Sequence, residues 1–156
     1  MSEYTKHLVP RPELRERIID TAVEAFSAHG IKSITMDDIA SSLGISKRTL
    51  YEVFSDKETL LEECILKGQK EGDEFLKNVL ATSGNVLEVL LKCYQRSIEQ
   101  FHATNKKFFE DIKKYPKAYA LMTNRHNQDS EETVNFFKEG VKPVSYTHLR
   151  AHETVL

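Results

Sequence analysis

The sequence has no tryptophan, only two cysteines and no long apolar run. Cys64 and Cys93 lack metal-ligand spacing and fall in helical patterns, so we expect buried, reduced thiols, with a redox-sensing pair as the alternative. The most apolar segment, VLEVLLKCY, is short and contains Glu88 and Lys92, which argues against a membrane span. No apolar run follows a basic start at the N-terminus, so we expect no signal peptide and a cytoplasmic protein.

Sequence motifs of catalytic sites are also missing. The chain has no Gly-rich phosphate loop, no Gly-x-Ser-x-Gly motif and no Cys-His pair of known spacing. His148 and His152 stand four residues apart, close enough on a helix to share a metal ion. No glutamate beside His148 can act as a base, and no third ligand is obvious, so we interpret the spacing as coincidence. We expect no enzyme, no metal site and no cofactor.

Charge of one sign is not in excess. The formal net charge is −2, and the composition, 40% hydrophobic and 29% charged, is ordinary for a globular protein. Such a balance counts against a non-specific nucleic-acid binder. It is compatible with a specific binder whose cations cluster at the groove.

Apolar residues recur at helical spacing along the chain, and no strand alternation is found. The pattern predicts a helix at about 13–29, ended by Gly30, and a long helix from about 56 that Gly68 and Gly72 weaken. A third long helix begins after Asn85, and its apolar residues surround it, which predicts a central position. A shorter helix ends at Pro116, and a last helix runs from about 117 to 140. The predicted fold class is all-α.

Residues 35–57 predict a helix-turn-helix and the start of a following helix: TMDDIASSLGISKRTLYEVFSDK. Gly44 can end the first helix in a left-handed conformation. Hydroxyl residues at the three helix starts are suitable N-caps: Thr35, Ser46 and Ser55. Asp38 and Glu58 lie three residues after the first and last of these and would complete two capping boxes.

The second helix of this motif, at about 47–53, has two different faces. Leu50 and Phe54 are expected to face a core. The outward side chains are hydroxyls, cations and an aromatic hydroxyl: Ser46, Lys47, Arg48, Thr49 and Tyr51. These groups suit phosphate oxygens and base edges in a major groove, whereas the alternative is a solvated face that binds nothing.

With the helix before it, this stretch resembles the DNA-binding domain of the tetracycline-repressor (TetR/AcrR) family of bacterial transcription regulators. The matching residues are Ile18 to Phe26, Gly30, Thr35, Ile39, Ala40, Gly44, Ser46, Leu50, Tyr51, Phe54, Lys57, Leu60 and Leu61. The resemblance implies that Thr35 and Lys57 contact phosphate. It also implies that the five outward residues of the second helix meet DNA. Val53 departs from the family, which often has a histidine or aromatic residue there.

The resemblance implies a helix-turn-helix DNA-binding domain at 13–59 and an incomplete helical ligand-binding domain at 60–143. A flexible arm at 1–12 is expected before them, and a tail at 144–156 that does not fit the family follows. The tail, VSYTHLRAHETVL, has no helical stripe and is expected to be foreign to the protein. The family normally continues with two more helices that form a homodimer. We therefore expect this chain to be monomeric or heterogeneous and to bind DNA weakly.

Large apolar side chains in the second half are expected to line a pocket for an unknown small molecule, as in the family, with core packing as the alternative. These residues are Phe101, Phe108, Phe109, Tyr115, Tyr119 and Met122. The overall hypothesis is a repressor that binds a palindromic double-stranded operator and is released by its ligand. The alternative is an all-α protein-interaction module or a non-functional fragment. Salt-dependent operator binding that requires Arg48 separates these readings.

Overall fold

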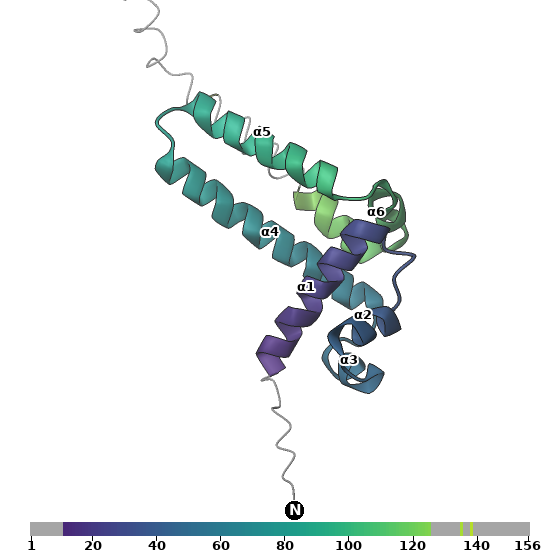
Figure 1. Cartoon of the computed structure of the whole chain (residues 1–156). Coiled ribbons are helices and arrows are strands. Elements are labelled where there is room, and N and C mark those ends of the chain that lie inside the picture. The colour runs from purple at the N-terminus through teal and green to yellow at the C-terminus, as the bar shows by residue number, and fades with distance from the viewer. Residues whose placement is uncertain (1–10, 126–134, 136–137, 139–156) are drawn as a thin grey trace, which may run out of the picture.

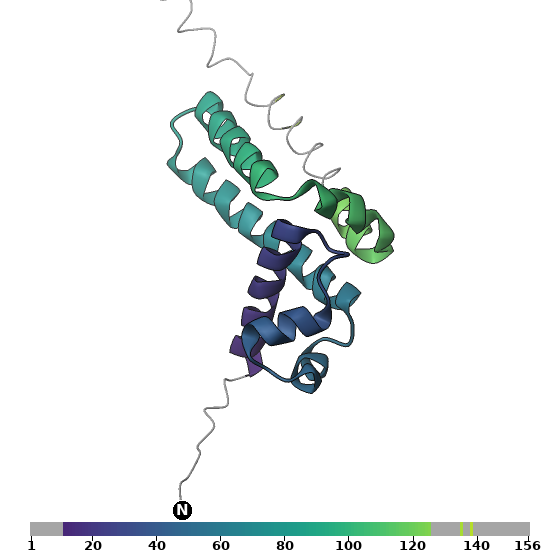
Figure 2. The same cartoon turned by 45° about the vertical axis from the view of Figure 1, so that its right-hand side comes forward.

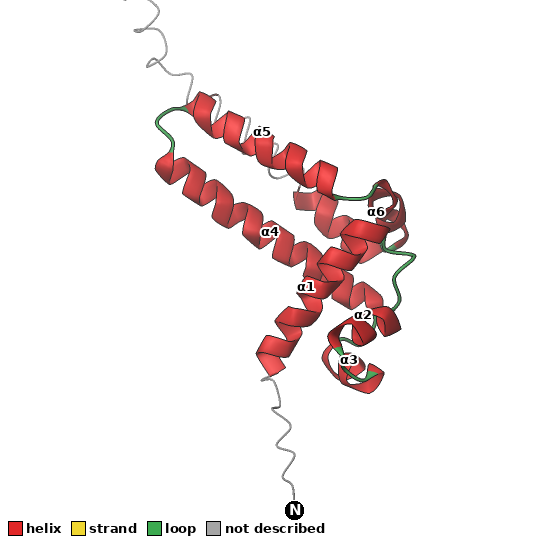
Figure 3. Ribbon diagram, viewed as in Figure 1, coloured by secondary structure: helices red, strands yellow, loops and turns green. Residues whose placement is uncertain are grey.

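The structure, a computed structural model, describes residues 11–125 together with residues 135 and 138. Its elements are α1 (Arg11–His29), α2 (Met36–Leu43), α3 (Lys47–Val53), α4 (Lys57–Thr82), α5 (Val86–Ala103), α6 (Lys106–Asp111) and the short 3-10 helix η1 (Ile112–Lys114). Residues 116–125 are helical as well. No strand occurs within these described residues (Figure 3), and the predicted all-α class is confirmed.

Helix α1 begins at Arg11, two residues before the predicted start. Pro12 therefore lies in the first turn of the helix and not in the arm, where the sequence predicts it. Proline is tolerated there because the first backbone N–H groups of a helix have no partner within it. The rest of the predicted arm, residues 1–10, lies outside the described residues, as do the end of the last helix and the tail with His148 and His152.

The helix-turn-helix forms as its local signals predict. The Thr35 side chain accepts a hydrogen bond from the Asp38 N–H and the Asp38 side chain accepts one from the Thr35 N–H, which completes the capping box. Gly44 ends α2 with φ 64°, in the left-handed region where glycine carries no steric cost. The Ser46 side chain then caps α3 through the Thr49 N–H.

The cap of α4 differs from the prediction. Asp56, not Ser55, occupies the cap position, and its side chain accepts the N–H of Thr59. The Ser55 hydroxyl donates to Asp56 Oδ2 at 2.9 Å, so it supports the cap from outside. An ionised carboxylate is the stronger acceptor at this position. Helix α4 then continues without a break through Gly68 and Gly72.

The main core joins α1, α2, α3 and the first half of α4 (Figures 1 and 2). Its most enclosed side chains are Ile18, Phe26, Ile31, Ile39, Leu50, Phe54, Leu60 and Leu61. Ile112 and Ala118, from the second half of the chain, are buried in the same cluster. Burying aliphatic and aromatic side chains stabilises a fold by about 1.5–3 kcal/mol each, so this cluster fixes α3 against the rest of the domain.

Helix α5 runs back along α4 and is not central in the described part of the chain (Figure 1). Only Val89 of this helix is buried. Leu87 and Phe101 are each 64% exposed and Leu91 is 59% exposed. The prediction of a central helix is wrong here because α4 covers only one side of α5.

The two cysteines have different surroundings. Cys64 is buried between α4 and α1, whereas Cys93 on α5 is only partly covered, and both thiols are free. The prediction of two buried thiols therefore holds for Cys64 alone. No helix within the described ranges is long and apolar enough to cross a bilayer.

Candidate nucleic-acid interface

The outward face of α3 is held at the surface by two buried anchors. Leu50 is fully enclosed, and Phe54, which follows the helix, is 2% exposed. Because these residues occupy the inner face, the side chains of Ser46, Lys47 and Arg48 are left exposed. Tyr51 is 41% exposed and Thr49 is partly buried. The structure thus brings five of the seven expected DNA contacts onto one short surface.

The hydroxyl groups of this surface are already engaged in caps. Ser46 Oγ accepts the Thr49 N–H at 3.0 Å and lies 2.8 Å from Thr49 Oγ1. A hydrogen bond between two hydroxyls uses only one of their two protons. One proton of this pair therefore remains for an outside acceptor such as a phosphate oxygen.

Thr35 stands at the start of α2, beside this surface, and is exposed. Its hydroxyl donates to Asp38 Oδ2 at 2.6 Å. This hydrogen bond and the one from the Thr35 backbone hold the pKa of Asp38 below its usual value. The Thr35 hydroxyl proton faces a carboxylate, so the hydroxyl must turn away from Asp38 before it can donate to a phosphate.

Each cation on α3 is paired with an exposed carboxylate. Lys47 Nζ lies 2.9 Å from Asp37 of α2, and Arg48 Nε lies 3.0 Å from Glu52 one turn further along α3. Hydrogen bonding to Asp37 raises the pKa of Lys47. Exposed pairs of this kind contribute only about 0–1 kcal/mol, so both cations can exchange carboxylate for phosphate at little cost.

The two acidic partners were not anticipated as part of the site. Glu52 could have been found from the sequence, because it follows Arg48 at the i, i+4 spacing of helical ion pairs. Asp37 is ten positions before Lys47, and only the turn between α2 and α3 brings them together.

Lys57 occupies a different environment from the other expected contacts. Its ammonium donates to the carbonyl oxygens of Ile31 and Ile34, in the turn between α1 and α2. It also lies 5.6 Å from the centre of the Phe26 ring, and burial lowers the pKa of Lys57. Two of its three N–H donors are therefore used inside the domain. The phosphate contact expected for Lys57 stays a prediction that depends on the third.

The six residues expected to bind a small molecule do not form one pocket. Tyr115 and Met122 pack against the main core, where core packing explains them, and Phe108 is partly buried against the same core. Phe101 stacks on Phe109 with ring centroids 5.9 Å apart, and Phe109 meets Phe108 edge to face at 5.6 Å. Tyr119 is 37% exposed. The structure therefore joins three of the six into one aromatic cluster at the junction of α5 and α6.

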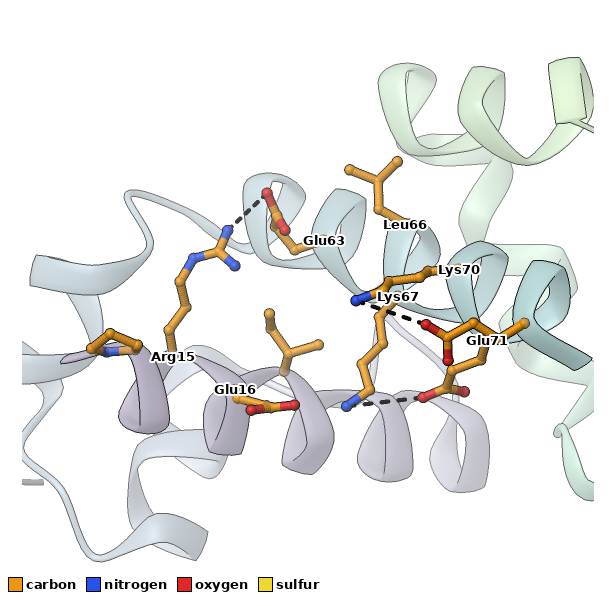
Figure 4. Close-up of a pocket in the computed structure, with 10 residues that line it drawn as sticks. Arg15, Glu16, Glu63, Leu66, Lys67, Lys70 and Glu71 are labelled. Atoms are coloured by element: carbon orange, nitrogen blue, oxygen red, sulfur yellow. Dashed lines mark ion pairs between the residues drawn. The ribbon is translucent and has the colours of Figure 1, made fainter. Parts of the chain in front are cut away.

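A groove of about 540 Å³ lies elsewhere, between α1 and α4 (Figure 4). Charged residues dominate its lining, and none of the six aromatic and methionine residues takes part. Arg15 pairs with Glu63 at 2.8 Å, and Lys67 and Lys70 also have carboxylate partners. This groove is too polar to be the expected apolar pocket. No group of three potential metal ligands occurs in the portion of the chain that the structure describes.

Part of this chain matches a known family of regulatory proteins. Residues 18–64 match the family model described as bacterial regulatory proteins, tetR family. The chain is similar to the biofilm operon icaADBC HTH-type negative transcriptional regulator IcaR of Staphylococcus aureus, with 26% identity over 111 residues. That match covers 71% of this chain and 54% of IcaR, so the chain spans about half the length of this relative.

Solved structures show the same fold over most of the chain. The ketosteroid transcriptional regulator KstR2 of Mycobacterium tuberculosis superposes with a TM-score of 0.63 at 21% identity, covering 83% of this chain and 68% of that one. The fatty acid degradation regulator FadR from Bacillus halodurans gives a TM-score of 0.52 at 21% identity, covering 86% and 75%. At these identities the likeness shows the fold alone.

Proposed function

We propose that this chain, whose residues 18–64 match the tetR family of bacterial regulatory proteins, binds an operator on double-stranded DNA and represses transcription. The observation that carries the proposal is the surface of α3, where Lys47, Arg48 and Tyr51 are exposed around an N-cap serine while Leu50 fixes the helix from behind. Repression is supported by the similarity to a negative regulator.

In the proposed complex the N-terminal half of α3 enters a major groove, as recognition helices of helix-turn-helix proteins do. Arg48 reads a base edge, because a guanidinium can donate two parallel hydrogen bonds to guanine. Lys47 contacts a phosphate after it leaves Asp37. Ser46, Thr49 and Tyr51 add contacts on the same face, and Thr35 adds one at the start of α2. Lys57 adds a phosphate contact only if its third N–H reaches the backbone of the DNA.

The proposed acting form is a cytoplasmic homodimer. A two-fold dimer presents two copies of α3 to successive major grooves, so its operator is roughly palindromic. One copy alone holds a single recognition helix and loses the second half-site. Light scattering of the chain with and without operator gives the number of copies in each complex.

A small molecule is the proposed signal for release. Phe101, Phe108 and Phe109 supply the apolar, aromatic contacts that such ligands use, and they lie at the junction of α5 and α6. A ligand that favours a geometry in which α3 no longer fits the groove lowers operator affinity through a coupling free energy, typically about 1–3 kcal/mol.

Selection from a pool of random duplexes tests the proposal. The purified chain is expected to enrich one sequence motif, with two inverted half-sites when the protein is dimeric. Lys106→Ala is the matched control for Lys47→Ala. Lys106 is also an exposed lysine paired with a carboxylate, Glu110, but it lies on α6, away from α3. Recovery of the wild-type motif by Lys106→Ala, together with weaker enrichment by Lys47→Ala, would support DNA binding by the α3 surface. Enrichment of no sequence at low salt would favour the protein-interaction module.

A further inference from the structure

Residues at α6 form hydrogen bonds with the end of α1 and with the turn that follows it. The Asn105 N–H donates to the Ser27 carbonyl at 2.7 Å, and its side-chain amide donates to the Ala28 carbonyl at 3.1 Å. Asp111, the last residue of α6, accepts the backbone N–H of Lys32 at 2.7 Å. Three hydrogen bonds thus join α6 and its cap to residues 27–32.

The contact is close as well as polar. Gly30 ends α1 with φ 86°, and a Cβ placed there would lie 2.7 Å from Lys107 Cβ and 3.3 Å from Asp111 Oδ2. Any other residue at this position would therefore be strained and would press against α6. The absence of a side chain at Gly30 is what lets α6 lie directly on the turn.

The turn is held from its other side by Lys57. Its ammonium donates to the carbonyls of Ile31 and Ile34, so the segment 30–34 lies between a carboxylate of α6 and an ammonium at the start of α4. Burial lowers the pKa of Lys57, and attraction to Asp111 and Asp38 partly opposes this effect. Thr35, the cap of α2, follows this segment immediately.

We propose that Asp111 is a positioning residue for DNA binding: by fixing the turn at 30–34, its carboxylate sets the orientation in which α2 and α3 meet the operator. This inference rests on the proposed operator binding. It links operator binding to the proposed ligand contacts, because Phe108 and Phe109 lie on the same short helix as Asp111.

A purely structural role for Asp111 makes a different prediction. In that case Asp111→Ala would lower the free energy of unfolding, while the fraction that remains folded would bind operator normally. A positioning role lowers operator affinity in fully folded protein. It also leaves affinity for a scrambled duplex unchanged, because phosphate contacts that do not depend on register survive a change of orientation.

The experiment compares wild type, Asp111→Ala, Asp111→Asn and Glu110→Ala by fluorescence anisotropy with the selected operator and a scrambled duplex. Measurements are made at a temperature where circular dichroism shows each variant to be folded. Asp111→Ala is expected to weaken operator binding by about fivefold or more and to speed hydrogen exchange at the Lys32 amide. Asp111→Asn keeps an oxygen that can accept this N–H and should recover most of the affinity. Glu110 is exposed and pairs with Lys106, so Glu110→Ala should match wild type.

Operator affinity for Asp111→Ala equal to that of wild type would overturn the inference. If Asp111→Ala does not fold, Asp111→Glu replaces it. That variant keeps the charge but displaces the carboxylate by one methylene, and it is expected to bind operator more weakly than wild type. Failure of wild type to distinguish operator from scrambled DNA would instead refute the proposed function, and the inference with it.

Discussion

Lys47 at the start of α3 forms an ion pair with Asp37 in the first turn of α2, with Nζ and Oδ1 2.9 Å apart. The pair spans the turn of the helix-turn-helix, and both side chains remain more than half exposed. The ammonium is therefore held at the outward surface of the motif without being buried. A phosphate can replace the carboxylate there, and the effect of removing this lysine can be calculated from counterion release.

Lys47→Ala is expected to weaken binding to operator and scrambled duplexes by similar factors. A phosphate contact carries no sequence information, and its loss lowers the slope of log affinity against log salt by about 1. Anisotropy titrations over a series of salt concentrations measure this slope. Lys106→Ala, with the same change of charge, should keep the wild-type slope. An unchanged slope for Lys47→Ala would remove this residue from the interface.

Lys57→Met is expected to destabilise the folded protein by about 1–3 kcal/mol. The substitution retains an apolar chain of similar length but leaves the carbonyls of Ile31 and Ile34 without their donor. Urea unfolding followed by circular dichroism measures the difference. Lys70→Met is the control, because Lys70 is an exposed residue whose only carboxylate contact in the described structure is Glu74 at 3.9 Å. Equal stability of wild type and Lys57→Met would mean that the inward contacts contribute nothing.

Acid is expected to destabilise the fold through its capping carboxylates. Hydrogen bonds from the Thr59 N–H and the Ser55 hydroxyl hold the pKa of Asp56 below its usual value, and those from Thr35 do the same for Asp38. A carboxyl group whose pKa is lower in the folded state than in the unfolded state, where it is about 3.9, stabilises the fold when it is ionised. This stabilisation is complete above the unfolded-state pKa and is lost as the pH falls through the folded-state pKa. The free energy of unfolding should therefore decline below about pH 4.

The variant Asp56→Asn tests this origin of the acid effect. Asparagine can still cap α4 but does not titrate, so the decline below about pH 4 should be shallower than in wild type. Urea midpoints at neutral pH and at two acidic values give the comparison. A decline as steep as that of wild type would place the acid sensitivity in other groups.

The two cysteines are expected to react with thiol reagents at different rates. Burial raises the pKa of the Cys64 thiol to about 12, so almost no thiolate is present at neutral pH, whereas Cys93 is partly accessible. Mass spectrometry after timed iodoacetamide treatment should show Cys93 modified first. Cys93→Ser should then be nearly inert in native buffer and reactive in urea. Fast labelling of Cys64 in the folded protein would contradict its burial.

The helix-turn-helix could be predicted from sequence because its signals are local. Thr35, Gly44 and Ser46 each act within four residues of their own position, through caps and one left-handed glycine. The predicted cap of α4, Ser55, is one residue before the observed cap, Asp56, because both are good capping residues. Local pattern alone does not decide between such neighbours.

Features that depend on tertiary contact could not be predicted. The inward position of Lys57 depends on how close the α1–α2 turn comes to α4, which only the folded chain determines. The contact of Asp111 with Lys32 joins positions 79 residues apart. The exposure of Leu87 on α5 depends on which elements pack over that helix, whereas apolar periodicity indicates only which side chains are available for packing.

The most direct test of sequence-specific binding by α3 is the affinity of wild type and Arg48→Ala for the selected operator and for a scrambled duplex at one salt concentration. Arg48 is 89% exposed, so its loss should leave the fold intact. We predict that Arg48→Ala costs about 1–3 kcal/mol on the operator, that it relaxes preference at one base position, and that it affects the scrambled duplex much less. Equal affinity of the two proteins for the operator would contradict the assignment of α3 as the recognition helix.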